Sequence, residues 1–76
     1  MNGSNILKGW IYSHYGSYMD MAVRLEVSVS TVSAWAQTQP RNMLKYLPEI
    51  SRYTGEKVDA IVCVVQEREK EIYGQA

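Results

Sequence analysis

The chain has 76 residues, of which 46% are hydrophobic, and its eight basic and eight acidic side chains leave no formal net charge. This length allows one domain with one small core, and the hydrophobic content excludes a wholly disordered chain. A single cysteine and a single histidine exclude an internal disulfide framework and a structural zinc site. We therefore expect one domain over residues 1–76 that holds no metal and no other cofactor.

The longest apolar run is far shorter than a membrane span, and the N-terminus lacks the basic and then apolar pattern of a signal peptide. These features predict a cytoplasmic protein that does not contact a membrane.

The charges are unevenly distributed. Residues 1–55 carry five basic and three acidic side chains, whereas residues 56–76 carry three basic and five acidic ones. Nucleic-acid-binding domains are often basic overall, so the balance argues against that class, although a local basic face stays open.

The first predicted helix lies between Ser4 and Gly16. Ser4 is the expected N-cap, because a serine hydroxyl accepts hydrogen bonds from the free amides of a first turn. Gly16 suits the left-handed position that ends many helices. His14, the one histidine, is expected to play a structural part at the end of this helix. The inward apolar residues, at the spacing of one helix face, are Leu7, Trp10 and Ile11.

A second short helix follows directly and runs to about residue 25. The letters SYMD at residues 17–20 are typical of a capping box, in which Ser17 caps the helix and Asp20 reaches back to it. Asp20 also suits the positive end of the helix dipole. The face toward the core is expected to carry Met21, Ala22 and Leu25.

The third element, within residues 27–37, has two interpretations. As a strand it would alternate valine and serine, but no turn signal follows it and no partner strand lies in the next twenty residues. As a helix it has Ser28 as its N-cap and an inward face at helical spacing, made of Val32, Trp35 and Ala36. The helix is favoured. Its outward residues are Val29, Ser30, Ser33, Ala34 and Gln37.

The remaining residues predict two further helical segments. Pro40 suits the first turn of a fourth helix, and Pro48 predicts a kink or a division into two shorter helices. Gly55 ends this part. Residues 57–73 predict a fifth helix, although its β-branched stretch at residues 60–65 also allows a strand. Its inward residues are expected to be Val58, Ile61, Val62, Val65 and Ile72, with Cys63 as a buried apolar residue and residues 67–73 as a charged face in solvent.

A helix-turn-helix consists of two short helices joined by a tight turn. Here the second helix is capped by serine and carries small residues on its outward face. Residues 18–37 resemble the helix-turn-helix of the lambda-repressor-like family, and especially of the Cro proteins of lambdoid phages. The matching residues are Ala22, Leu25, Val27, Ser28, Val32, Ser33 and Trp35. The likeness covers about residues 5–55. Glu26 departs from it, because the family usually has a left-handed glycine there, and a non-glycine residue costs on the order of 1 kcal/mol.

The predicted segments and the resemblance together indicate an all-α bundle of about five short helices, with a core domain at residues 1–55 and, beyond the resemblance, a C-terminal helix at residues 56–76. The resemblance also implies a transcriptional regulator of phage or prophage origin that binds a double-stranded DNA operator as a homodimer. The acidic C-terminal segment is the expected pairing element, because its valines exceed what one packed face needs. The third helix would read bases in the major groove through Ser28, Val29, Ser30, Thr31, Ser33, Ala34 and Gln37. The expected phosphate contacts are Ser17, Tyr18, Arg41, Asn42 and Lys45.

A different class of function stays open. The outward face of the third helix has no Arg, Lys or Asn, which make the strongest contacts to guanine and adenine, so that only Gln37 remains. A protein-binding helix-turn-helix module, such as an antirepressor or an antitoxin-like partner, would look the same. The sequence has no glycine-rich phosphate loop, paired catalytic carboxylates or nucleophile motif. We therefore expect no catalytic residues, no enzymatic activity and no small-molecule ligand.

Overall fold

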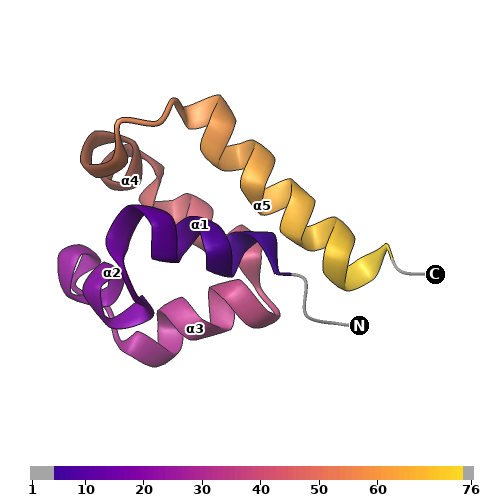
Figure 1. Ribbon diagram of the computed structural model, residues 1–76, viewed down its shortest axis with the longest axis horizontal. Coiled ribbons are helices and arrows are strands. Elements are labelled where there is room, and N and C mark those ends of the chain that lie inside the picture. The colour runs from indigo at the N-terminus through magenta and orange to yellow at the C-terminus, as the bar shows by residue number, and fades with distance from the viewer. Residues whose placement is uncertain (1–4, 75–76) are drawn as a thin grey trace.

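The computed structural model describes residues 5–74, and this part of the chain is helical without any strand. The segments are α1 (Ile6–Tyr15), α2 (Tyr18–Leu25), α3 (Val29–Gln37), the 3₁₀ helix η1 (Pro40–Tyr46), α4 (Leu47–Thr54) and α5 (Val58–Tyr73). Figure 1 shows α1 in the middle, with α2 and α3 on one side of it and α5 on the other. The predicted all-α class is confirmed. The strand alternative for residues 60–65 is wrong, because they lie within α5.

The core takes residues from every helical segment, and all segments before α5 are too short to be stable without burying an apolar face. As expected, Val32, Trp35 and Ala36 of α3 are buried, and so are Met21 and Ala22 of α2. The remaining buried hydrophobic residues are Leu7, Ile11, Tyr15, Met43, Ile50, Ile61 and Val65. The helix interpretation of residues 27–37 is therefore confirmed together with its phase.

Helix ends follow the predicted signals in α2 and α3. The Ser17 hydroxyl accepts from the Asp20 amide at 3.0 Å and donates to the Asp20 carboxylate at 3.1 Å. The Ser28 hydroxyl accepts from the Thr31 amide at 3.1 Å. Glu26 between them takes the left-handed conformation, with φ 60° and ψ 44°, as the turn requires. The tight turn between the two helices thus forms with a non-glycine residue in it.

The start of α1 differs from the prediction. Ser4 lies outside the described residues, and the N-cap is Asn5, whose side-chain oxygen accepts from the Lys8 amide at 2.9 Å. At the other end of α1, the His14 ring lies 4.6 Å from the Trp10 ring at an interplanar angle of 49°, and its Nε2 lies 3.3 Å from the Glu56 carboxylate. The contact with Glu56 holds α1 to the segment that precedes α5. This is the structural role expected of the histidine.

The two prolines divide the fourth element as predicted. Pro40 is buried at the start of η1, and Pro48 lies in the first turn of α4. Gly55 ends α4 at a φ of 79°, where a glycine is favoured. On the same side of the molecule the Tyr15 and Tyr53 rings stack at 4.5 Å, and burial raises the pKa of Tyr15 to about 12.

Three expectations for α5 are wrong. Cys63 is exposed, because it lies on the side of the helix opposite Ile61 and Val65. Val58, expected on the inward face, is 44% exposed at the first turn. The charged residues 67–73 also face solvent only in part, with Lys70 and Tyr73 exposed. Arg68 turns toward the protein, and its side chain is only 12% exposed.

Arg68 connects the end of α5 to the end of α3. Its Nε donates to the Ala36 carbonyl at 2.7 Å, and its Nη2 donates to the Gln37 carbonyl at 3.1 Å. The last carbonyls of a helix have no partner within the helix, and a guanidinium is a planar fork of donors that can satisfy two of them. Glu71 accepts from Arg68 Nη1 at 3.1 Å and from the Ile6 amide at 3.0 Å. The ends of three helices therefore meet at one cluster of polar contacts.

None of the helices within residues 5–74 is long and apolar enough to cross a lipid bilayer.

Replacing Trp35 with alanine is expected to lower the free energy of unfolding by about 3–5 kcal/mol, because a large buried ring leaves a cavity in a small core. Val29→Ala, at an exposed position of the same helix, is the matched control and should change it by about 0.5 kcal/mol or less. Urea unfolding followed by circular dichroism measures both. Equal losses in the two variants would show that Trp35 contributes no more than a surface residue.

Replacing Arg68 with methionine keeps the length of the side chain but removes the donors to the two α3 carbonyls. We expect a loss of about 2 kcal/mol in the free energy of unfolding, together with faster hydrogen exchange of the α3 amides. Arg68→Lys should recover only part of the loss, because an ammonium does not bridge two carbonyls as a fork does. Arg52→Met, at an exposed arginine of α4, should leave both measurements unchanged.

Candidate nucleic-acid interface

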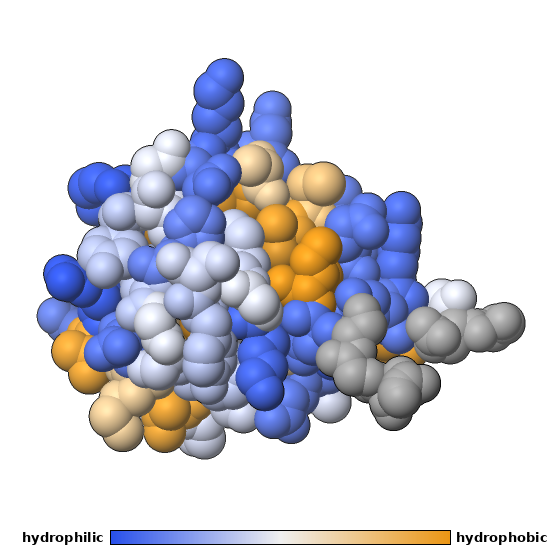
Figure 2. All heavy atoms as spheres, viewed as in Figure 1, coloured by the Kyte–Doolittle hydropathy of each residue, from blue (hydrophilic) through white to orange (hydrophobic). Residues whose placement is uncertain are grey.

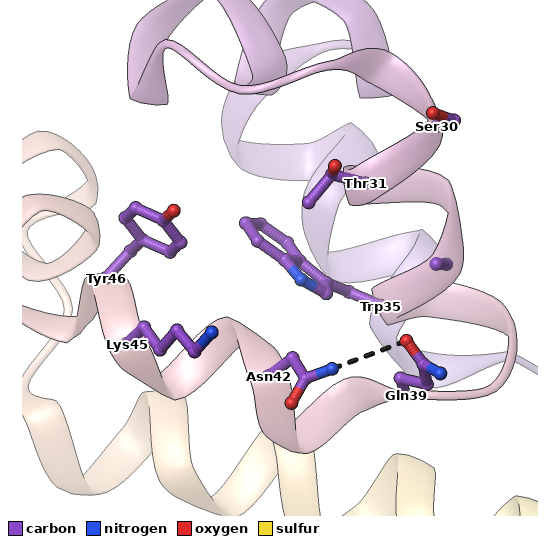
Figure 3. A pocket seen from close by; sticks show the side chains of 8 residues that line it. Ser30, Thr31, Trp35, Gln39, Asn42, Lys45 and Tyr46 are labelled. Atoms are coloured by element: carbon purple, nitrogen blue, oxygen red, sulfur yellow. Dashed lines mark hydrogen bonds between the residues drawn. The ribbon is translucent and has the colours of Figure 1, made fainter.

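A groove of about 290 Å³ lies between α3 and η1. Figure 3 shows Thr31 and Trp35 directed from α3 toward Lys45 and Tyr46 on η1. Asn42 and Gln39 lie at the lower end of the groove in this view. The residues that line the groove are Ser30, Thr31, Ala34, Trp35, Gln39, Asn42, Lys45 and Tyr46. The groove thus joins part of the predicted base-reading face to part of the predicted phosphate-binding set.

The spacing of the η1 residues follows from the kind of helix that η1 is. A 3₁₀ helix has three residues per turn, so that residues three apart lie above one another. Gln39, Asn42 and Lys45 have this spacing and line the same side of the groove. In an α-helix, residues at this spacing turn progressively away from one face. The 3₁₀ geometry of residues 40–46 therefore directs Asn42 and Lys45 toward α3, and Gln39, which immediately precedes η1, lines the same side.

Buried side chains fix the distance between the two walls. Trp35 is almost fully buried beneath the groove, and its ring lies 5.5 Å from the Tyr46 ring at an interplanar angle of 40°. The amides of Thr38 and Gln39 both donate to the Ala34 carbonyl, at 2.9 and 2.8 Å, which turns the chain sharply from α3 into η1. The groove is therefore a preformed feature of the packed core.

The chemistry of the groove suits a ligand that carries negative charge and hydrogen-bond acceptors. Its eight lining residues, all within the described part of the chain, include one cation, Lys45, and no acidic side chain. Asn42 donates to the Gln39 side-chain oxygen at 3.3 Å, which orients both amides. The Ser28 hydroxyl lies 3.1 Å from that of Ser30 and 2.8 Å from that of Thr31. This cluster holds the hydroxyl groups at the start of α3 in a defined arrangement.

Only part of the predicted base-reading set lies in the groove. Ser30, Thr31 and Ala34 line it, and Val29 is exposed at the first turn of the same helix. The Ser28 hydroxyl is occupied by its capping bonds. Ser33 and Gln37 lie outside the groove, where the Gln37 amide donates to the Ser33 hydroxyl at 3.1 Å.

The predicted phosphate contacts also divide into two groups. Asn42 and Lys45 line the groove, whereas the Ser17 hydroxyl caps α2 and is bonded to Asp20. Tyr18 is partly buried with its ring edge against Tyr12, and burial raises the pKa of its hydroxyl. The structure therefore brings together Ser30, Thr31, Ala34, Asn42 and Lys45 from the two predicted sets.

Arg41 is held in a bidentate ion pair with Glu69 of α5. Its Nε and Nη2 donate to the two carboxylate oxygens at 2.9 and 3.0 Å. The hydrogen bonds from Arg41 lower the pKa of the Glu69 carboxyl, and the same contact raises the pKa of the guanidinium. The Arg41 side chain is nevertheless 74% exposed. It is thus open to solvent, but its charge is already partnered in the free protein.

Gln39, Trp35 and Tyr46 were not predicted to lie at this surface, although all three line the groove. The spacing of three residues between Gln39, Asn42 and Lys45 was the available signal, but it predicts a shared face only if the segment is a 3₁₀ helix. Trp35 was correctly assigned to the core. It forms the base of the groove, because it lines the groove from α3 while remaining almost fully buried.

No family model, curated protein or solved structure matches the chain. The likeness to the lambda-repressor-like family therefore stays a prediction from the residues of the helix-turn-helix.

Proposed function

We propose that the protein is a sequence-specific DNA-binding transcriptional regulator, similar to the Cro proteins of lambdoid phages, that binds an operator as a homodimer. The observation that carries the proposal is the groove, where Ser30, Thr31 and Ala34 of α3 stand opposite Asn42 and Lys45 of η1. A base-reading helix beside polar and cationic phosphate contacts is the arrangement by which helix-turn-helix proteins hold a duplex. The α2–turn–α3 geometry, with a left-handed residue in the turn, supports the same conclusion.

In this proposal α3 enters the major groove with its N-terminal half foremost. Ser30 and Thr31 would donate to or accept from base edges, and Val29 and Ala34 would contact thymine methyl groups. Asn42 and Lys45 would bind the phosphates of the adjacent strand and so fix the register of α3. Because none of these base contacts is a bidentate arginine or asparagine pair, specificity would come from several weak contacts and from the shape of the DNA.

A second function, binding to another protein through the same motif, is favoured by one observation. Met19 and Val23 on α2, together with Val29 at the start of α3, are exposed apolar side chains of the helix-turn-helix. A neutral protein with such residues beside a helix-turn-helix suits an antirepressor or an antitoxin-like partner as well. The two functions differ in their dependence on Lys45 and on salt, because a phosphate backbone requires cations and an apolar surface does not.

Replacing Ser30 with glutamate is expected to weaken operator binding by at least about tenfold, because it places a bulky carboxylate in the major groove, where the potential of the duplex is negative. The measurement is fluorescence anisotropy on the duplex selected from a random DNA library, or on DNA that flanks the protein's own gene. Ser13→Glu, at an exposed position of α1, is the matched control. Circular dichroism should be unchanged in both. Selection of no preferred duplex by the wild-type protein would overturn the proposed function.

The dependence on salt tests the phosphate contacts. If each subunit binds two or three phosphates, a plot of log affinity against log salt has a slope of about −4 to −5 for the dimer. Lys45→Ala should make the slope shallower. Glu69→Gln should make it steeper and raise affinity at low salt, because it frees the Arg41 guanidinium from its carboxylate. A slope near zero would support the protein-binding function instead.

A further inference from the structure

The outer side of α5 carries one continuous stripe of exposed residues. They recur at alternating intervals of four and three residues, the spacing that keeps side chains on one face of a long helix. The stripe consists of Asp59, Cys63, Gln66, Lys70 and Tyr73, and all five are exposed. The opposite side of the helix holds the buried Ile61 and Val65 and the inward-facing Arg68. Figure 2 shows an apolar area over α5, bordered by hydrophilic side chains.

The charge order of the stripe is complementary to that of an antiparallel copy of the same stripe. The antiparallel alignment is centred between Cys63 and Gln66. Asp59 lies as far before this centre as Lys70 lies after it. Two copies of α5 placed antiparallel, with Cys63 opposite Gln66, bring each Asp59 opposite Lys70 of the other copy.

We propose that α5 is the homodimer interface and that it pairs antiparallel with α5 of a second copy, with Asp59 opposite Lys70 and Cys63 opposite Gln66 across a two-fold axis. The proposal deepens the proposed function, because a two-fold operator requires a two-fold protein. The occupant is a second copy because two identical ion pairs arise from one alignment, in which each Lys70 exchanges its exposed contact with Glu67 of the same helix, at 3.4 Å, for Asp59 of the other copy. A different partner would have to reproduce this charge order by itself.

The place of α5 in the fold is compatible with this pairing. The exposed stripe and the groove between α3 and η1 share none of their residues, so both are available in one molecule. Next to the stripe, Gln66, Lys70 and Tyr73 line an open hollow together with Arg41 and Glu69. In the antiparallel alignment this hollow faces the N-terminal half of the partner's α5, whose exposed outward residues are Asp59 and Cys63.

Charge exchange tests the alignment. Lys70→Glu is expected to weaken self-association by at least about tenfold, since two attractive pairs become repulsive. Asp59→Lys should do the same, and the double variant Asp59→Lys/Lys70→Glu should restore association, because both pairs re-form with reversed signs. Lys8→Glu, at an exposed lysine of α1, is the matched control and should associate like the wild type. Sedimentation equilibrium without DNA measures all five proteins.

Mixed cross-linking tests the register. Wild-type protein carries its one thiol at residue 63, and the variant Cys63→Ser/Gln66→Cys carries one at residue 66. The alignment predicts that a disulfide dimer forms far faster in a mixture of the two than in either protein alone, because only positions 63 and 66 face each other. Equal rates for wild-type protein alone and for the mixture would overturn the antiparallel register.

The outcomes separate this inference from the proposed function. A wild-type protein that sediments as a monomer at the highest concentration that stays in solution, or a double variant no better than the single ones, overturns the α5 interface. If that monomer still selects a DNA sequence, the proposed DNA binding survives in the form of a half-site. A dimer that depends on the charge order but selects no duplex supports the α5 interface and overturns the proposed function.

Discussion

The rest of the structure depends on how the last backbone carbonyls of α3 find hydrogen-bond donors. This helix has nine residues, too few to be stable in isolation, and its last carbonyls have no partner within it. The Arg68 fork supplies donors to the Ala36 and Gln37 carbonyls, and the Asn5 side chain donates to the Ala36 carbonyl at 2.9 Å. The start of α1 and the end of α5 are therefore fixed at the same point. Because these contacts and Trp35 hold α3 from its inner side, its outer side is free to face a ligand.

Elements with a local signal were predictable from the sequence. The serine caps of α2 and α3, the left-handed turn at Glu26 and the break between the two prolines each depend on residues within a few positions of one another. The contacts that were not predicted join residues far apart in the chain. Arg68 lies 32 positions from Ala36, and Arg41 lies 28 positions from Glu69. A run of charges at the end of a helix indicates a face in solvent unless the carbonyls of another helix lie within reach, and no local pattern reveals that.

The candidate site was predictable on the α3 side and only partly on the η1 side. The outward residues of α3 follow from its helical phase, which the burial of Val32 and Trp35 confirms. The side chains of η1 depend instead on the 3₁₀ geometry and on the packing of the Trp35 and Tyr46 rings. Sequence periodicity does not distinguish a 3₁₀ helix from an α-helix over seven residues. For this reason Asn42 and Lys45 were assigned by their chemistry, whereas Gln39 and Tyr46 were not assigned to the surface.

The two sides of α5 relate assembly to DNA binding. Its inner side holds the end of α3 through Arg68, and the Tyr73 hydroxyl donates to the Thr38 carbonyl at 3.3 Å. A second molecule that pairs with the outer side would therefore position a helix to which α3 is already attached at its C-terminal end. The separation of the two α3 helices in such a dimer is then set by two rigid connections and one helix pair, without a flexible linker between them. Since half-site spacing must match about one turn of the duplex, a short and fully partnered connection of this kind favours one operator spacing over others.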